Sequence, residues 1–147
     1  MHHYLRPLLV PASFALVGAS ERAGSLGRVV MENVLAGGYA GAFHAVNPRH
    51  RTLFGRPCHA SLAAIGERVE LAVIAVPCDA VPGVLADAAK AGVRAALLLT
   101  ATPAGDAALA RRWSHDVAAL AAKNAIRLVG PGAFGVIRSG IGLNATF

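Results

Sequence analysis

A glycine-rich stretch near the start of the chain has the residue types that can hold a phosphate group. It runs from Gly18 to Gly27 with the spacing G-x-S-x-x-x-G-S-x-G. Glycines let the backbone approach an anion closely, and the free N–H groups at the start of a helix attract negative charge. The spacing matches neither G-x-G-x-x-G nor the Walker A pattern. The stretch predicts a phosphate-bearing ligand; the alternative is a structural turn whose glycines only allow close packing.

A second group of residues, at the end of a predicted strand over 43–47, helps to choose between ligands. The segment Val46-Asn47-Pro48-Arg49-His50-Arg51 has three basic side chains and no carboxylate. NAD sites usually place an Asp or Glu at this point to bind the ribose hydroxyls. A ribose that carries an additional phosphate fits better, because arginine binds phosphate through charge-assisted hydrogen bonds. NADP and coenzyme A (CoA) both fit, and a solvated basic loop is the alternative.

Predicted strands alternate with predicted helices along the chain, and these elements must position the residues described above. The sequence predicts strands over 14–17, 43–47, 71–76, 95–99 and 128–129, and helices over 25–36, 81–91 and 106–124. An irregular lead-in is expected over 4–12, a short edge piece over 52–55 and a helical turn over 61–65. This alternation predicts an α/β class, a doubly wound Rossmann-like domain whose mainly parallel sheet has five strands or slightly more, with helices on both faces. The length of 147 residues fits one domain, 1–147.

The ends of the predicted strands differ from the apolar strands themselves. Each is small, polar or proline-bearing, at 18–20, 46–49, 76–77, 100–102 and 130–132. Ligands of such sheets bind outside the carboxyl ends of the strands, near the point where the strand order reverses. These five ends are therefore expected to form one rim and one site.

Composition argues against several classes of function. The net charge is +6, but the basic residues are scattered and aromatics make up only 5%, which disfavours nucleic-acid binding. Mean hydropathy is high, at +0.53, yet no long uninterrupted apolar run predicts a membrane span. With no signal-peptide pattern, a cytoplasmic protein is expected. Cys58 and Cys78 suit neither a metal site nor a disulfide framework, so both are expected to be packed residues.

Six short motifs, taken in order, resemble one known family. They are Val-Gly-Ala-Ser, Gly-Ser-x-Gly, Val-Asn-Pro, Leu-Ala-Val-Ile-Ala-Val-Pro, Arg-Leu-x-Gly-Pro and Leu-Asn-Ala-Thr-Phe. From about Leu8 to Phe147 the chain resembles the N-terminal CoA-binding domain of NDP-forming acyl-CoA synthetases. These enzymes are related to the α subunit of succinyl-CoA synthetase, and the module also occurs in protein lysine acetyltransferases. The resemblance implies CoA or acyl-CoA as the ligand, lying across the strand ends.

The resemblance also implies which residues bind the coenzyme. The glycine stretch would hold the phosphates and the start of the pantetheine, the end of the second strand would lie by the adenosine, and two later strand ends would flank the coenzyme and its pantetheine. These four groups are, in order, Gly18, Ser20, Gly24, Ser25 and Gly27; Val46, Asn47, Pro48 and Arg49; Val76 and Pro77; and Thr100. Replacing Gly24 or Gly27 by Glu is expected to abolish CoA binding and leave the fold intact.

Two loops depart from the family pattern. The last loop reads Gly130-Pro131-Gly132-Ala133, where the family usually has Gly-Pro-Asn followed by Cys or Ser. The loop after 95–99 reads Thr-Ala-Thr-Pro in place of Ser-Ala-Gly-Phe. Loss of the polar side chains near the thioester weakens acyl transfer more than binding.

Catalytic residues are not apparent in the sequence. The six histidines match no phosphohistidine motif, and no nucleophile and base are suitably spaced. The segment is therefore expected to bind rather than catalyse, without a metal, as the N-terminal part of an acyl-CoA synthetase with downstream ligase or ATP-grasp domains or subunits. The alternatives are a stand-alone CoA-binding or regulatory protein and an NADP-binding domain. A homodimer is compatible with the sequence.

Overall fold

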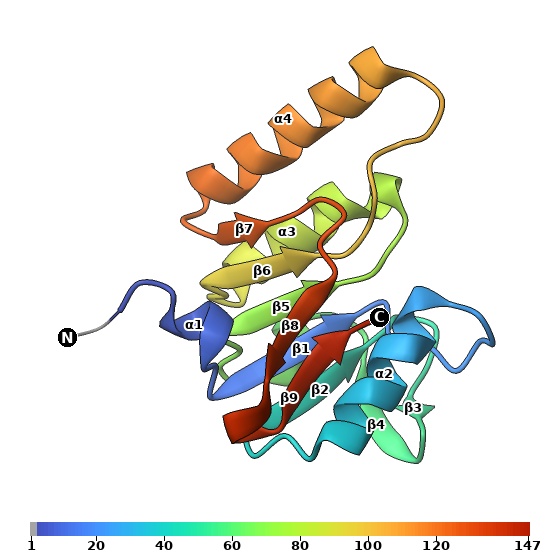
Figure 1. The fold of residues 1–147 in the computed structure, drawn as a ribbon, viewed down its shortest axis with the longest axis vertical. Helices are drawn as coiled ribbons and strands as arrows, with labels where there is room; N and C mark the ends of the chain where they lie inside the picture. Colours follow the sequence, from blue (N-terminus) through green and yellow to red (C-terminus); the bar gives the residue numbers. More distant parts are fainter. Residues whose placement is uncertain (1–2) are drawn as a thin grey trace.

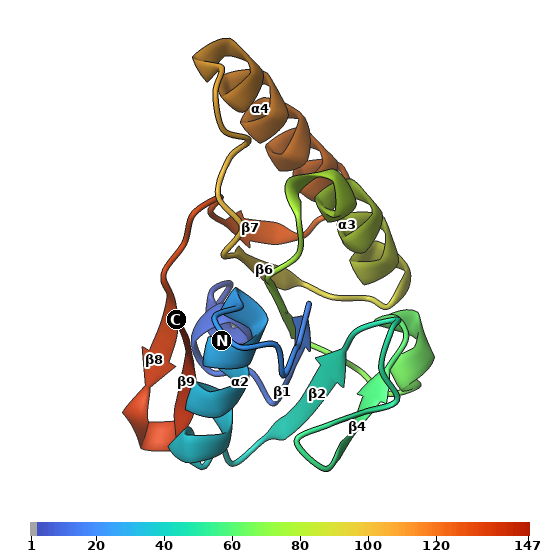
Figure 2. The same cartoon turned by 90° about the vertical axis from the view of Figure 1, so that its right-hand side faces the viewer.

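The computed structural model describes residues 3–147, which form a seven-stranded sheet with helices on both faces (Figure 1; Figure 2). The strand order is β3-β4-β2-β1-β5-β6-β7, and every neighbouring pair is parallel except β3 and β4. The strands are β1 (Ser13–Val17), β2 (Ala42–Val46), β3 (Thr52–Leu53), β4 (Arg56–His59), β5 (Leu71–Ile74), β6 (Ala95–Leu98) and β7 (Arg127–Val129). This confirms the doubly wound α/β prediction.

Three of the α-helices connect parallel strands that follow one another in the chain, as the sequence predicts. Four α-helices and three 3-10 turns are present within residues 3–147: α1 (Arg6–Leu9), α2 (Leu26–Gly37), α3 (Val81–Lys90), α4 (Ala107–Lys123), η1 (Ala63–Ile65), η2 (Cys78–Ala80) and η3 (Ser139–Ile141). The longest, α4, extends away from the body of the domain at one end (Figure 1). None of the helices between residues 3 and 147 is both long and apolar enough to span a bilayer.

The core consists of two apolar clusters, one on each face of the sheet. Successive side chains of a strand point to opposite faces, so β1 contributes to both clusters and all five of its residues are buried. Phe14 and Leu16 pack with Met31 of α2, whereas Ala15 packs with Leu85 of α3. The faces of the sheet are thus covered by different helices, and the loops that connect them with the strands gather at the strand ends.

A two-stranded ribbon at the end of the chain adds to the α2 face. It consists of β8 (Gly135–Arg138) and β9 (Leu143–Thr146), which are antiparallel. Leu143 and Ala145 of β9 are buried in the cluster that contains α2, and Asn33 Nδ2 donates to the Thr146 carbonyl at 2.9 Å. The sequence analysis does not predict this ribbon, because its alternating residues are few and two glycines interrupt them.

Two further elements differ from the sequence prediction. The lead-in is not wholly irregular, because Arg6–Leu9 form one helical turn, which Pro7 tolerates near a helix start. At the sheet edge β4 extends the expected edge piece into a hairpin, although Pro57 and its polar neighbours give no apolar run. The predicted start and end of α2 are confirmed: Ser25 is its N-cap and Gly38 is its left-handed C-cap, at φ 66°.

Candidate functional site

The strand order reverses at β1, which lies between β2 and β5. The chain leaves β1 toward α2 on one face of the sheet and leaves β5 toward α3 on the other, and sheets of this kind bind ligands at the carboxyl ends of such a strand pair. Gly18 and Ala75 directly follow β1 and β5 at this edge. A Cβ on Gly18 would lie 2.3 Å from the Ala75 carbonyl oxygen, and its φ is +93°. Gly18 is therefore required for two backbones to approach each other, and no larger residue fits there.

The glycine loop, residues Gly18 to Ser25, uses its own side chains to set its shape. Ser25 Oγ accepts a hydrogen bond from the Arg28 N–H at 3.2 Å and donates to the Arg22 carbonyl at 2.8 Å. Ser20 Oγ accepts from the Arg22 N–H at 3.0 Å. The N–H groups of Leu26 and Gly27 lie in the first turn of α2, where no intrahelical acceptor exists. An anion at this loop would thus meet backbone N–H groups and the positive end of α2.

The two remaining glycines of the stretch have different roles. At Gly27 a Cβ would lie 1.9 Å from the Gly18 carbonyl oxygen, inside the packed loop. This contact contradicts the expectation that the fold survives Gly27→Glu, because a side chain at Gly27 fits only if the backbone of the loop moves. Gly24 has φ +73° and nothing within 4 Å of its Cβ position, and it is exposed. Of the three glycines in the stretch, Gly24 alone offers an open position, where an added Cβ would meet no other part of the protein within 4 Å.

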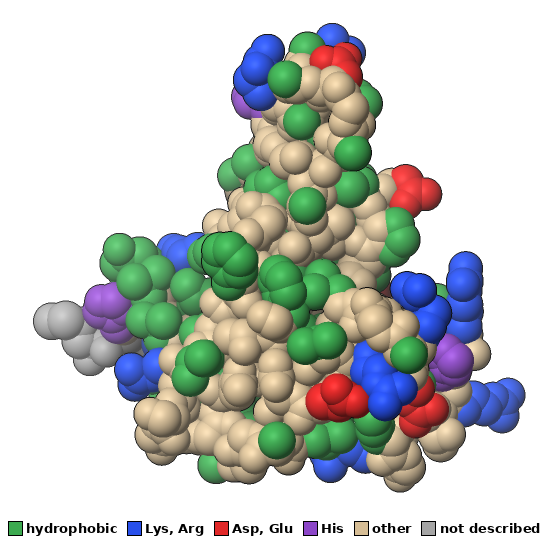
Figure 3. Space-filling model, turned by 45° about the vertical axis from the view of Figure 1, so that its right-hand side comes forward, with side chains coloured by type: hydrophobic (Ala, Val, Ile, Leu, Met, Phe, Trp, Pro, Cys, Tyr) green, Lys and Arg blue, Asp and Glu red, His purple; other side chains and the backbone are tan. Residues whose placement is uncertain are grey.

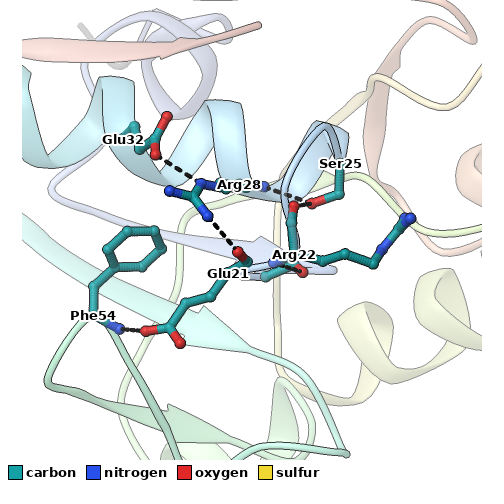
Figure 4. Close-up of polar contacts among 7 residues, drawn as sticks. Glu21, Arg22, Ser25, Arg28, Glu32 and Phe54 are labelled. Carbon is teal, nitrogen blue, oxygen red and sulfur yellow. Dashed lines mark hydrogen bonds and ion pairs between the residues drawn. The ribbon is translucent and has the colours of Figure 1, made fainter.

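A polar network holds the glycine loop against the β3–β4 hairpin (Figure 4). A Glu21 carboxylate oxygen accepts a short hydrogen bond from the N–H of Phe54, and the Glu21 carbonyl accepts from Arg28 Nη1 at 2.7 Å. Arg28 also pairs with Glu32 at 2.8 Å and lies over the Phe54 ring, 6.0 Å from its centroid. Sequence analysis does not find this network. The i,i+4 spacing of Arg28 and Glu32 predicts their ion pair, but no short-range sequence pattern indicates the contact with Phe54.

At the end of β2 the side chain of Asn47 connects two loops. Its Nδ2 donates to the Ala19 carbonyl at 2.9 Å, and its Oδ1 accepts from the Arg49 N–H at 2.9 Å, which forms an Asx turn. The basic loop, residues Pro48 to Arg51, is exposed beyond this turn. Figure 3 shows basic side chains and a histidine gathered on one side of the molecule. The structure thus places Asn47 beside the glycine loop, with its amide used for internal contacts and the arginines open to solvent.

The ends of β5 and β6 are fastened by Thr100. Its hydroxyl donates to the Val76 carbonyl at 2.6 Å, and Thr100 itself is 9% exposed. The Thr100 carbonyl accepts from the N–H of Gly132, at 2.9 Å, so the last loop folds against the same strand ends. Pro77 is exposed at the start of η2. The five predicted strand ends therefore do meet at one edge of the sheet, although the Thr100 hydroxyl is occupied by a structural bond.

The titratable side chains of residues 3–147 do not form a metal site. No three His, Cys, Asp or Glu side chains come together there in a way that could hold a metal ion. Burial raises the pKa of the Cys58 thiol, whose Sγ lies 3.7 Å from the Asn47 carbonyl. This environment fits the expected packing role of Cys58 and not a reactive thiolate. The strand ends present backbone donors and arginines, which can bind an anion.

Comparison with known proteins agrees with this geometry. A family described as "CoA binding domain" matches residues 12–139. The chain is 32% identical over 140 residues to acetate–CoA ligase [ADP-forming] I of Archaeoglobus fulgidus, covering 95% of this chain and 20% of that protein. It is 31% identical to the α subunit of acetate–CoA ligase [ADP-forming] I of Pyrococcus furiosus, covering 97% of this chain and 32% of that subunit. It therefore spans a fifth to a third of these relatives.

A solved structure shows the same fold. The dinucleotide-forming acetyl-coenzyme A synthetase 1 of Ca. Korarchaeum cryptofilum, in complex with phosphate and ADP, matches with a TM-score of 0.89 and 32% identity. The match covers 97% of this chain and 30% of that one. Sequence and structure thus agree over nearly the whole length, and the chain belongs to the CoA-binding domain family, in the form found within ADP-forming acetate–CoA ligases.

Proposed function

We propose that this domain binds CoA or acyl-CoA along the carboxyl edge of its sheet, with the phosphates on the glycine loop and the adenosine beside the basic loop. The observation that carries the proposal is the start of α2 at the point of strand-order reversal, where the first N–H groups of the helix have no intrahelical acceptor and Gly24, just before the helix, has nothing within 4 Å of its Cβ position. Gly18, Ser20, Ser25 and Gly27 then act by shaping the loop.

The remaining predicted residues fit the same placement. Asn47 holds the basic loop against the glycine loop, so Pro48 and Arg49 flank the space expected for the adenosine. Val46 is 2% exposed and its side chain packs in the core, so the prediction that Val46 lies by the adenosine does not extend to its side chain. We assign the 3′-phosphate of CoA to Arg49, because its guanidinium is exposed directly after the Asx turn. On the other side, Val76, Pro77 and Thr100 would border the pantetheine, with the Thr100 hydroxyl fixing the strand ends rather than contacting the ligand.

Thermal unfolding with CoA, NADP and NAD tests the proposal. A ligand present at about 100 times its dissociation constant stabilises a fold by about 2.7 kcal/mol. For a domain of this size, CoA should raise the melting temperature by about 5–10 °C. NADP carries its additional phosphate on a different ribose hydroxyl, so we expect a smaller shift with NADP and none with NAD. A shift with NADP as large as that with CoA, or no shift with CoA, contradicts the proposal.

We further propose that the domain supplies the CoA site of an ADP-forming acyl-CoA ligase and depends on other domains or subunits for catalysis. Support comes from relatives that are three to five times longer than the matched segment, among them separate α subunits. The test is to mix this domain with acetate, ATP and CoA and to assay for acetyl-CoA, alone and with the catalytic parts of such a ligase. Formation of acetyl-CoA by the domain alone would overturn this proposal.

A further inference from the structure

We propose that Glu21 is a positioning residue for the recognition of the 3′-phosphate of CoA, and that it acts by holding the basic loop against the glycine loop. This inference rests on the proposed function. It starts from the turn between β3 and β4. Phe54 and Gly55 both have positive φ, 50° and 69°, as the two-residue type I′ hairpin turn requires. A bulky non-glycine residue in this region is strained, so other contacts must hold it.

Polar contacts to Phe54 come from the glycine loop and the start of α2, and its side chain also packs against the core cluster on the α2 face. The Glu21 carboxylate accepts the Phe54 N–H, and the Arg28 guanidinium lies over the Phe54 ring while binding the Glu21 carbonyl (Figure 4). Leu53, just before the turn, is 1% exposed and anchors the hairpin in the core. The turn is thus fixed in position relative to Glu21.

The basic loop lies between two attachments to the glycine loop. At its start, Asn47 Nδ2 binds the Ala19 carbonyl, and beyond its end the Phe54 N–H binds Glu21. Arg49, His50 and Arg51 lie between these attachments and are exposed. The Arg51 carbonyl accepts from the Cys58 N–H of β4 at 2.8 Å, so the end of the basic loop is fixed to the hairpin. Because the attachment of the hairpin to the glycine loop uses the Glu21 side chain, Glu21 sets how far the hairpin and these arginines lie from the proposed phosphate site.

The position of Glu21 is otherwise unfavourable for the proposed ligand. A carboxylate in a loop that binds phosphate repels the ligand, and this lowers affinity unless the carboxylate is useful elsewhere. Two variants separate charge from hydrogen bonding. Glu21→Gln removes the charge but keeps an oxygen that can accept the Phe54 N–H, whereas Glu21→Ala removes both. Glu32→Ala is the control. Glu32 is exposed and binds Arg28, as Glu21 does, but Glu32 itself does not contact the hairpin.

Calorimetry with CoA and 3′-dephospho-CoA measures the effect. Glu21→Ala should bind CoA about fivefold more weakly than Glu21→Gln, the value of one net hydrogen bond, and the two variants, which have the same charge, should bind 3′-dephospho-CoA equally. Glu21→Gln and Glu32→Ala should bind CoA at least as tightly as the parent. Equal binding of CoA by Glu21→Ala and Glu21→Gln, with neither weaker than the parent, overturns the inference. A loss in Glu21→Gln as large as in Glu21→Ala also overturns it, because the charge would then be responsible.

A second measurement needs no ligand. Trypsin cleavage after Arg49 and Arg51 should be faster in Glu21→Ala than in the parent and in Glu21→Gln, while cleavage after Arg112 in α4 should be unchanged. Equal rates at Arg49 and Arg51 in all three proteins, or a rise at every site, contradict the positioning role. If the parent does not bind CoA, the proposed function fails, and the cleavage rates still decide whether Glu21 holds the loop.

Discussion

Both edges of the sheet carry arginines and open glycines, but a helix begins at the carboxyl edge and a helix ends at the amino edge. At the carboxyl edge, α2 begins beside the glycine loop. At the amino edge, α3 ends beside a cavity of ≈ 510 Å³ whose lining includes Arg68, Lys90 and Arg94. This cavity is large and basic, yet it lies at the C-terminal end of α3, where the helix dipole is negative and attracts cations rather than phosphates. The direction of the helices, rather than hollow volume or charge alone, indicates which edge suits a phosphate.

The largest expected effect on stability comes from adding one methyl group at Gly27, at the carboxyl edge of the sheet. Gly27→Ala places a Cβ 1.9 Å from the Gly18 carbonyl oxygen, so it should lower the free energy of unfolding by about 3 kcal/mol or more. Urea unfolding measures this change. The control is Gly83→Ala on the outer side of α3, where nothing lies within 4 Å and a gain of about 0.5–1 kcal/mol is expected. Equal stability of the two variants would show that the loop can relax.

A pair of matched glycine variants compares the two edges directly. Gly24→Glu and Gly92→Glu both add a carboxylate at an open position with φ near +75°, the first on the glycine loop and the second at the amino-edge cavity. Each should cost about 1–2 kcal/mol in backbone strain. Only Gly24→Glu should abolish CoA binding in calorimetry, through repulsion of the phosphates. Loss of binding in Gly92→Glu with retention in Gly24→Glu would move the proposed site to the amino edge.

Arginine variants make the same comparison with a smaller effect. Arg49→Ala should weaken CoA binding about tenfold, since a charge-assisted contact contributes about 1.5–3 kcal/mol. It should leave 3′-dephospho-CoA nearly unchanged, and Arg94→Ala at the amino edge should affect neither ligand. The four affinities of parent and Arg49→Ala for the two ligands form a thermodynamic cycle. Additive losses from removing the arginine and the 3′-phosphate would show that the two groups do not touch.

The smallest expected effect is a pH dependence of stability that is independent of the ligand. His44 of β2 has a buried Nε2 with no hydrogen-bond partner among the described residues, and Glu67 Oε2 lies 3.6 Å away. Burial lowers the pKa of His44, the nearby His59 lowers it further, and Glu67 partly opposes both. Because the unfolded chain then binds a proton more readily, His44 should reduce stability as the pH falls below about 6.5.

This effect is checked by urea unfolding at several pH values. The contribution of His44 to the slope cannot exceed about 1.4 kcal/mol per pH unit, the value for one proton. His44→Phe should flatten the slope between pH 6.5 and 5. An unchanged slope would mean that other groups cause the pH dependence of the parent.

The sequence by itself determined the α/β architecture, the limits of α2 and the strand ends that share one edge. These depend on local signals: apolar runs that must be buried on both faces, a serine that can cap a helix and glycines that can adopt positive φ. The ordered motifs also sufficed to indicate the CoA-binding family, which the comparisons confirm. The assignment of individual residues to CoA is still a prediction.

Tertiary structure alone decided what each residue of the glycine stretch does. Gly24 and Gly27 look alike in the sequence, but only the path of the chain brings the Gly18 carbonyl against Gly27 and leaves Gly24 open. The Glu21–Phe54 contact joins residues 33 positions apart, and the β8–β9 ribbon is held by α2 from the far end of the chain. Such contacts depend on which backbones pack together. Patterns over a few neighbouring residues do not determine this, because the contacting residues are far apart in the chain.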